Sequence, residues 1–160
     1  MRRLSFLFVL LAFGCANPTL WKFDALETGL AEFDSARLLY SDPKSASPLR
    51  FEIDRIGYEI VAYLNLAQYK LTQGPSVVVS LKIGDEVYEE ELPILEGRMR
   101  LRLSQTMTRK LVLALQEGKS VKFSTDGFEE TLQCDNFTPL YQKLVKNTEF
   151  LQNILQGMEE

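Results

Sequence analysis

The feature that most constrains the fold is a series of short β-prone segments separated by turn-forming residues. Residues 77–83 are rich in Val, Leu and Ile, and residues 86–92 follow after the pair Gly84 and Asp85. Such a pair between two β-prone runs is typical of a tight turn. The sequence therefore predicts a β-hairpin in which these two runs are the paired strands.

Further strands are expected on both sides of this hairpin. Residues 49–54 and 57–66 are rich in aromatic and aliphatic side chains, and residues 98–103 alternate Arg with Met or Leu. A second hairpin is predicted over residues 119–134, because the Asp-Gly pair at residues 126–127 favours a type I′ turn. Strands that lie this close in sequence favour antiparallel pairing.

Two helices are predicted after the first strands. One covers residues 105–117, where apolar side chains recur at helical spacing between Ser104, a suitable N-cap, and Gly118, the expected C′ residue. The second begins after Asn136 and keeps an apolar stripe to Leu155. The expected fold class is α+β, with an antiparallel β-sheet of meander and hairpins covered on one face by two helices.

The segment before these strands predicts a third, shorter helix. Leu26, Leu30 and Phe33 fall at helical spacing, and the helix would end near residues 34–35. Residues 41–48 contain two prolines and several small residues, which indicates a loop.

The first residues have the layout of a secretory signal peptide. Two arginines follow Met1, residues 4–13 are apolar except for Ser5, and Gly14 opens a small-residue exit. The apolar run is shorter than the roughly 20 residues that span a bilayer. We therefore expect export and removal of residues 1–14, which changes the formal net charge from −4 to about −6.

Ala12, Phe13, Gly14 and Cys15 resemble the lipobox of bacterial lipoprotein precursors. The resemblance implies that Cys15 is lipidated on its sulfur, that the chain is cut after Gly14, and that the new amine is acylated. It also implies transfer to the outer membrane, because Ala16 rather than Asp follows the cysteine. Two or three acyl chains anchor a protein stably, whereas a single chain binds a membrane only marginally.

Cleavage by ordinary signal peptidase is the alternative. This enzyme recognises a small-x-small cleavage site, which is present before a cut after Gly14 and before a cut after Ala16. The product would be a soluble periplasmic or secreted protein. If Cys15 then stays unmodified, it can form a disulfide with Cys134 in an oxidising compartment. If Cys15 is lipidated, Cys134 is expected to be a small buried residue.

These patterns divide the chain into a signal peptide (1–14), a tether (15–19), an N-terminal arm with its loop (20–48), and an α+β domain with a C-terminal helix (49–160). Trp21, close to the tether, is expected either at the membrane interface or in the core. Asn136, in an Asn-Phe-Thr sequence, is either a glycosylation acceptor or only a helix cap.

The composition excludes several kinds of chemistry. The chain has no histidine, which removes Ser-His-Asp and Cys-His catalysis and His-ligated metals. No nucleophile elbow, P-loop or dinucleotide motif occurs. We expect no cofactor and no metal, and the acidic charge makes nucleic acid an unfavourable partner.

A run of arginines is the candidate anion-binding face. Arg98, Arg100 and Arg102 would project from one face of a strand and could bind phosphate, a lipid headgroup or a polymer carboxylate. The alternative is structural: these arginines would only pair with Glu89 and Glu91 of the neighbouring hairpin strand.

A run of carboxylates is the second charged feature. Asp85, Glu86, Glu89, Glu90 and Glu91 crowd the first hairpin. Such carboxylates can serve as a glycosidase-like acid and base. Acidic side chains also keep an exposed edge strand from pairing with other chains, and this is the interpretation we adopt.

The sequence thus predicts an exported, lipid-anchored protein of the outer membrane that acts as a non-catalytic binding or assembly module. Its expected partners are the membrane, through Cys15, and an envelope protein, through the C-terminal helix. The alternatives are a carboxylate-dependent envelope enzyme that acts on cell-wall or lipid material, and a soluble periplasmic or secreted protein.

Overall fold

The computed structural model describes residues 20–26, 35–57, 59–66, 70–71 and 74–146. Its elements are β1 (Trp21–Leu26), β2 (Ser35–Tyr40), β3 (Leu49–Ile56), β4 (Glu59–Leu66), β5 (Ser76–Ile83), β6 (Glu86–Pro93), the 3₁₀ turn η2 (Glu96–Arg98), β7 (Arg100–Arg102), α1 (Gln105–Gln116), β8 (Val121–Thr125) and β9 (Phe128–Leu132). A C-terminal helix begins at Phe137 and is described as far as residue 146.

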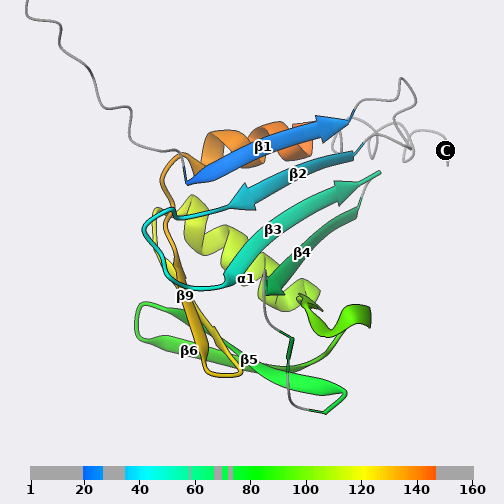
Figure 1. Ribbon diagram of the computed structural model, residues 1–160. Coiled ribbons are helices and arrows are strands. Elements are labelled where there is room, and N and C mark those ends of the chain that lie inside the picture. Colours follow the sequence, from blue (N-terminus) through cyan, green and yellow to red (C-terminus); the bar gives the residue numbers. More distant parts are fainter. Residues whose placement is uncertain (1–19, 27–34, 58, 67–69, 72–73, 147–160) are drawn as a thin grey trace, which may run out of the picture.

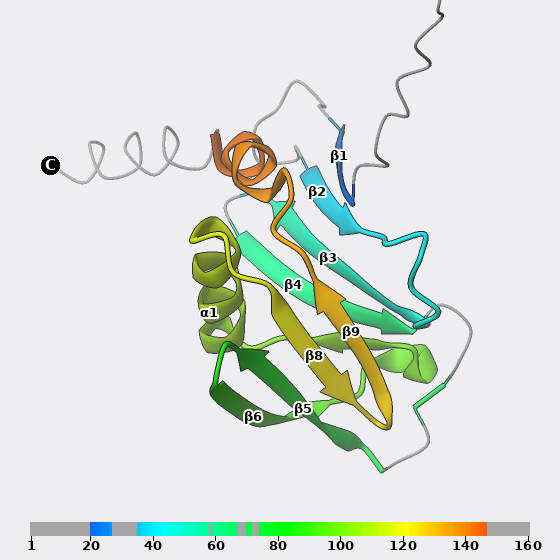
Figure 2. The ribbon, with the colours of Figure 1, turned by 90° about the vertical axis from the view of Figure 1, so that its left-hand side faces the viewer.

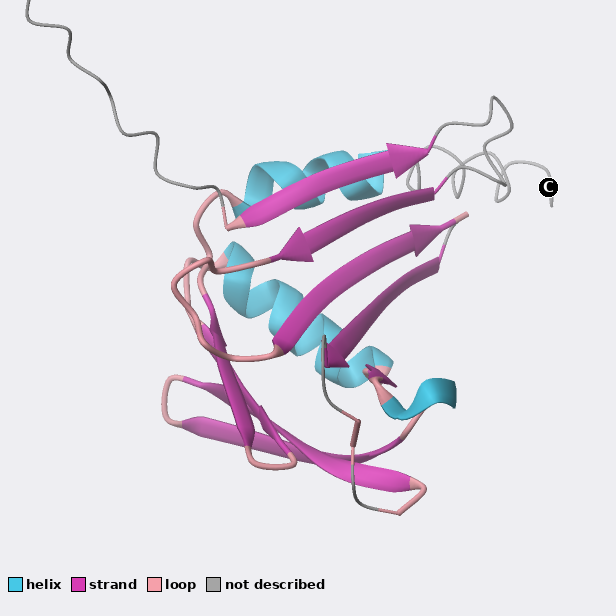
Figure 3. Ribbon diagram, in the orientation of Figure 1, coloured by secondary structure: helices cyan, strands magenta, loops and turns pink. Residues whose placement is uncertain are grey.

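The strands form two antiparallel sheets, so the α+β class is confirmed while the single expected sheet is divided (Figures 1 and 3). The five-stranded sheet has the order β1-β2-β3-β4-β7, and the four-stranded sheet has the order β6-β5-β8-β9. Every strand pair is antiparallel.

Both predicted hairpins are confirmed, and their turns explain why. In the β5–β6 hairpin Ile83 faces Glu86, which leaves a two-residue turn, and Gly84 adopts a φ of 60° that suits glycine. In the β8–β9 hairpin Asp126 (φ 48°) and Gly127 (φ 80°) are both left-handed, as a type I′ turn requires.

The helix predicted around residues 26–33 is wrong where the structure describes it. Leu26 ends strand β1, and Leu30 and Phe33 lie outside the described residues. The flanking segments instead follow the two-residue period of strands, with Ala36, Leu38 and Tyr40 buried on one face of β2. Residues of the expected arm thus form the first two strands of the five-stranded sheet.

The two sheets meet in an aromatic core. The ring of Phe51 on β3 stacks on Phe123 of β8 with centroids 5.6 Å apart, and Trp21 lies edge-on to Tyr40 at 5.0 Å. Trp21 is buried and packs against Phe137 of the C-terminal helix at 4.8 Å. The core interpretation of Trp21 is therefore confirmed.

Polar atoms of the same aromatic side chains pair with the backbone beside β9. The indole Nε1 of Trp21 donates to the carbonyl of Gln133 at 2.7 Å, and the Tyr40 hydroxyl donates to the carbonyl of Thr131 at 2.9 Å. The Gln133 N–H in turn donates to the Tyr40 hydroxyl at 3.3 Å. Side chains of the first sheet thus satisfy backbone groups at an edge of the second, where unpaired groups would be costly.

At another border the sheets are joined by backbone. Ile94, just after β6, forms an isolated bridge with Leu101 of β7, and the Leu95 N–H donates to the Arg100 carbonyl at 3.0 Å. Strand β7 therefore links the end of β6 to β4.

Both helices lie on the same side of the five-stranded sheet (Figures 1 and 2). The predicted α1 is confirmed with its caps: the Ser104 hydroxyl accepts from the Met107 N–H at 3.1 Å, and Gly118 follows with a φ of 78°. The C-terminal helix buries Phe137 and Leu144. Among the described residues, neither helix combines the length and the apolar character needed to cross a membrane.

Candidate functional site

The five-stranded sheet has one face turned away from both helices, which we call the open face (Figure 1). The alternation of each strand and the pairing registers place on it Lys22, Asp24 and Leu26 of β1, Ser35, Arg37 and Leu39 of β2, Arg50, Glu52, Asp54 and Ile56 of β3, Glu59, Val61, Tyr63 and Asn65 of β4, and Arg100 and Arg102 of β7. Charged side chains from all five strands thus share a surface that no described helix covers.

Two carboxylates of this face are nearly buried. Glu52 is 6% exposed and Asp54 is 5% exposed, although both point away from the hydrophobic core. Removing a carboxylate from water is unfavourable unless cations and hydrogen bonds compensate. The surrounding side chains must therefore both cover and neutralise them.

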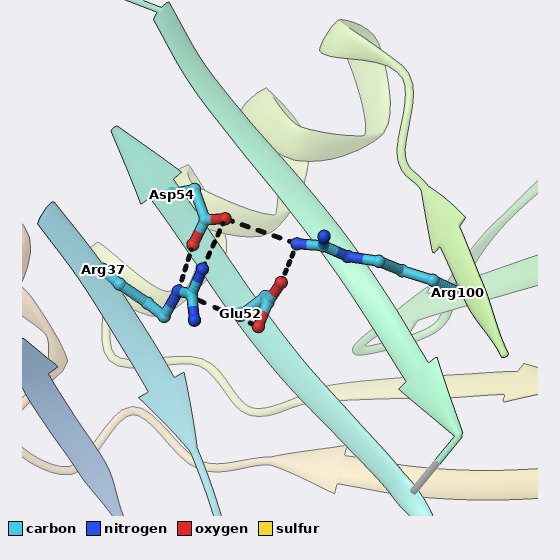
Figure 4. A network of polar contacts seen from close by, with 4 residues as sticks. All are labelled: Arg37, Glu52, Asp54 and Arg100. Carbon is cyan, nitrogen blue, oxygen red and sulfur yellow. Dashed lines mark hydrogen bonds and ion pairs between the residues drawn. The ribbon is translucent and has the colours of Figure 1, made fainter. Parts of the chain in front are cut away.

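Two arginines meet this requirement (Figure 4). Arg37 donates to both oxygens of Asp54, from Nε at 2.8 Å and from Nη2 at 3.3 Å, and its Nε lies 4.0 Å from Glu52. Arg100 donates from Nη2 to Glu52 and, at 3.3 Å, to Asp54. The hydrogen bond with Asp54 raises the pKa of the Arg37 guanidinium, while partial burial opposes this shift. We call these four side chains the network.

Tyr63 fixes one of the two guanidinium groups. The central carbon of the Arg100 guanidinium lies 3.6 Å from the centroid of the Tyr63 ring, so the cation stacks on the aromatic face. With carboxylates at one end and a ring against its plane, Arg100 has little rotational freedom. The arrangement presents a charged group in a fixed orientation.

A hollow of about 510 Å³ borders the network at the end of strands β1 to β3. It is lined by Asp24, Ala25, Leu26, Ser35, Ala36, Arg37, Asp54, Arg55 and Ile56. Leu26 and Ile56 are the large apolar side chains at this end, 64% and 58% exposed. The hollow therefore offers apolar contacts together with two arginines, Arg37 and Arg55, and two carboxylates, Asp24 and Asp54.

The predicted arginine run is only partly a strand feature. Arg100 and Arg102 lie on β7 and share the open face, but Arg98 belongs to the turn η2. Gly97 (φ 82°) and Arg98 (φ 58°) are both left-handed, so the chain bends before the strand begins. The Nε of Arg98 donates instead to the carbonyl of Leu71 at 2.9 Å. The prediction that all three arginines share one strand face is wrong.

The predicted acidic partners are also wrong. Strand β7 pairs with β4 and not with β6, so Arg102 contacts Glu59, and Arg100 contacts Glu52 and Asp54. Neither contacts Glu89 or Glu91, which lie on the other sheet. Arg100 and Arg102 do pair with acids, but these acids come from β3 and β4, which are far from β7 in the sequence.

Sequence reasoning missed Arg37, Glu52 and Asp54. The available signal was the alternation of charged residues 50, 52 and 54 with apolar residues 49, 51 and 53. This alternation identifies a two-faced strand, but it cannot say which cations lie beside it. Arg37 could not be placed beside these acids, because the sequence did not predict its segment to be a strand.

The acidic run lies where the edge interpretation requires. Strand β6 is an edge strand of the four-stranded sheet, and Glu86, Glu89 and Glu91 are exposed. Glu90 is half-buried and accepts a hydrogen bond from the Ser104 hydroxyl at 2.6 Å. The described part of the chain contains no group of three or more side chains suited to hold a metal.

Cys134 is half-buried, packs against the core and forms no disulfide within the described part of the chain. Its proposed disulfide partner and lipidation site, Cys15, lies outside the described residues. No protein-family model, no curated protein and no solved structure matches this chain.

Proposed function

We propose that this protein is an exported, lipid-anchored envelope protein that acts as a non-catalytic binding module, with the open face as its binding surface. The observation that carries the proposal is the burial of Glu52 and Asp54 beneath side chains of opposite charge. The arginines that cover them remain 46% and 36% exposed. A partner that approaches this face meets guanidinium groups before it meets their carboxylates.

The charge distribution supports an anionic partner. The cations of the open face, all exposed or partly exposed, are Lys22, Arg37, Arg50, Arg100 and Arg102. The exposed carboxylates on the same face are Asp24 and Glu59. With Glu52 and Asp54 included, the open face has five cations and four carboxylates, whereas the chain as a whole carries a formal charge of −4. This face is therefore less acidic than the protein as a whole, which gives an anionic partner a preferred side.

A binding role fits the chemistry of the network better than an acid–base role. A general acid or base needs a carboxylate that can exchange its proton with a substrate. Asp54 accepts hydrogen bonds from two guanidinium groups, and Glu52 is paired with Arg100. Both carboxylates thus serve as acceptors for arginine side chains, which fits a binding role.

The lipid anchor would keep this face near a membrane. The segment between Cys15 and Trp21 spans at most about 20 Å when fully extended. Trp21 is buried in the core at the start of β1, so the five-stranded sheet would follow the anchor closely. The C-terminal helix stays a second candidate surface for an envelope protein partner, with residues 147–160 outside the described residues.

Intact-mass analysis of the protein purified from its own host tests the anchor. We expect the mass of residues 15–160 plus diacylglyceryl and acyl groups, and loss of that increment in a Cys15→Ala variant. A Cys134→Ala variant is the matched control, because it removes the other thiol and should keep the lipid. An unlipidated mass would overturn the anchored form and favour a soluble periplasmic or secreted protein.

A further inference from the structure

We infer that Arg37 and Arg100 together bind one phosphate ester group on the solvent side of Asp54. The inference deepens the proposed function and rests on it only in taking the open face as the binding surface.

The two guanidinium groups are close enough to share one anion. The Nη2 atoms of Arg37 and Arg100 each lie 3.3 Å from the same oxygen, Oδ2 of Asp54. Oxygen atoms of one phosphate group can therefore reach a nitrogen of each guanidinium at ordinary hydrogen-bond lengths.

Both arginines retain unused donors. A guanidinium carries five N–H groups. Arg37 uses Nε and Nη2, and Arg100 uses Nη2 alone. Among the described residues, neither Nη1 group has a hydrogen-bond partner. The Nε of Arg100 also has none, but it is buried, so the unused Nη1 groups are the donors that remain for a ligand on the solvent side. A tetrahedral phosphate offers more acceptor oxygens to such donors than a carboxylate does.

The site is already organised before a ligand arrives. Asp54 and Glu52 hold the guanidinium ends, and the Tyr63 ring supports the plane of Arg100. Long flexible cations normally lose side-chain entropy on binding, and this loss is smaller where neighbours already fix them. Asp54, Glu52 and Tyr63 are thus positioning residues.

The adjacent hollow accommodates the organic part of the ligand. Arg37 and Asp54 form one of its walls, and the exposed apolar side chains of Leu26 and Ile56 line the same hollow. A phosphate held by the two arginines would direct its ester group toward these apolar contacts. Phospholipid headgroups and soluble phosphate esters share this chemistry, so the experiment must distinguish the two sources.

The test uses the full chain carrying Cys15→Ala, which removes any contribution from an acyl anchor. One arm titrates glycerol 3-phosphate by calorimetry. The other measures co-sedimentation with phosphatidylcholine vesicles, with and without phosphatidylglycerol. We expect saturable binding of glycerol 3-phosphate and retention on the anionic vesicles only. Binding of the soluble ester without vesicle retention would also support the site and assign its ligand to a soluble or polymeric ester.

Variants identify the residues that bind. Arg100→Lys keeps a cation beside Glu52 but loses the guanidinium fork, and we expect at least fivefold weaker binding with an unchanged circular dichroism spectrum. Arg37→Gln should weaken binding about tenfold, a change that corresponds to about 1.4 kcal/mol. Lys122→Gln is the matched control, because it removes a cation paired with Glu129 on the other sheet. It should change binding less than twofold.

Three results would overturn the inference. The first is no saturable binding of glycerol 3-phosphate up to tens of millimolar. The second is equal binding by Arg100→Lys and the unsubstituted Arg100 protein. The third is an equal loss in Lys122→Gln, which would indicate a general charge effect. None of these results bears on the mass of the mature protein, so failure of this inference and failure of the lipid anchor are read separately.

Discussion

Asp54 is the residue on which the network depends, because it accepts hydrogen bonds from both Arg37 and Arg100. It lies on an open sheet face and is nevertheless nearly buried. Removing its carboxylate takes the shared acceptor from two guanidinium groups, and a hydrogen bond to a charged group contributes roughly 1.5–3 kcal/mol. Stability should therefore respond to Asp54 much more than to an acid in an exposed pair.

We expect Asp54→Ala to lower the free energy of unfolding by about 3 kcal/mol. Glu59→Ala is the control, since Glu59 pairs with Arg102 while both side chains stay about half exposed. That substitution should cost less than about 1 kcal/mol. Urea denaturation of the two variants gives the comparison, and equal losses would show that the network stabilises no more than a surface pair.

The buried phenol of Tyr40 should make the stability of the protein depend on pH. Burial raises the pKa of its phenol to about 12, although the hydrogen bond from Gln133 opposes the shift. A raised folded-state pKa means that stability is fully present below the unfolded value, near 10, and is lost as the pH rises toward 12. We expect the free energy of unfolding to fall over that window.

Replacing Tyr40 by Phe should make this alkaline loss shallower. At neutral pH the variant should be about 1–2 kcal/mol less stable, because the Thr131 carbonyl and the Gln133 N–H lose their partner. Denaturation at pH 7, 10 and 11.5 tests both effects. An identical alkaline slope in the variant would assign the loss to other groups.

At the scale of elements, chain reversals depend on residues that tolerate left-handed backbone. Gly118 ends α1 with a φ of 78°, and its N–H donates to the Leu115 carbonyl at 3.2 Å. The space around it is open, so the conformation alone opposes a side chain there.

We expect Gly118→Ala to lower the free energy of unfolding by about 1 kcal/mol. Gly74→Ala is the matched control, because an added Cβ at Gly74 meets no atom within 4 Å and its φ is not positive. It should be neutral or slightly stabilising. Thermal unfolding of both variants measures the difference, and a neutral Gly118→Ala would contradict the role of its backbone conformation.

At the scale of the whole molecule, the two sheets and the C-terminal helix share one core. Trp21 of the first sheet contacts Phe137 of the helix, and Phe51 stacks on Phe123 of the second sheet. Shared aromatic packing couples the stability of the parts that meet there. The described domain should unfold in a single step.

Trp21 is the sole tryptophan, so its fluorescence reports on this junction. We expect its unfolding transition to coincide with that of far-ultraviolet circular dichroism. Phe123→Ala, on the other sheet, should lower the free energy of unfolding by about 3–5 kcal/mol, and both probes should report the same loss. Separate transitions would show that the sheets unfold independently.

Features that depend only on neighbouring residues could be predicted from the sequence. The turns at Gly84 and Asp126, the caps of α1, and the alternating strands were all predictable, because a few adjacent side chains and φ angles decide them. The α+β class follows from the order of those elements.

Which strands are neighbours in the sheets became clear only from the folded structure. The pairing of β7 with β4 placed Arg100 over Tyr63, and the pairing of β2 with β3 placed Arg37 beside Asp54. Sequence proximity had suggested acids of β6 instead. Strand order and register are fixed because segments far apart in the sequence bury a common core. Local sequence preferences do not specify which of these segments pair. The open face is therefore a property of the folded chain that its sequence periodicity could not reveal.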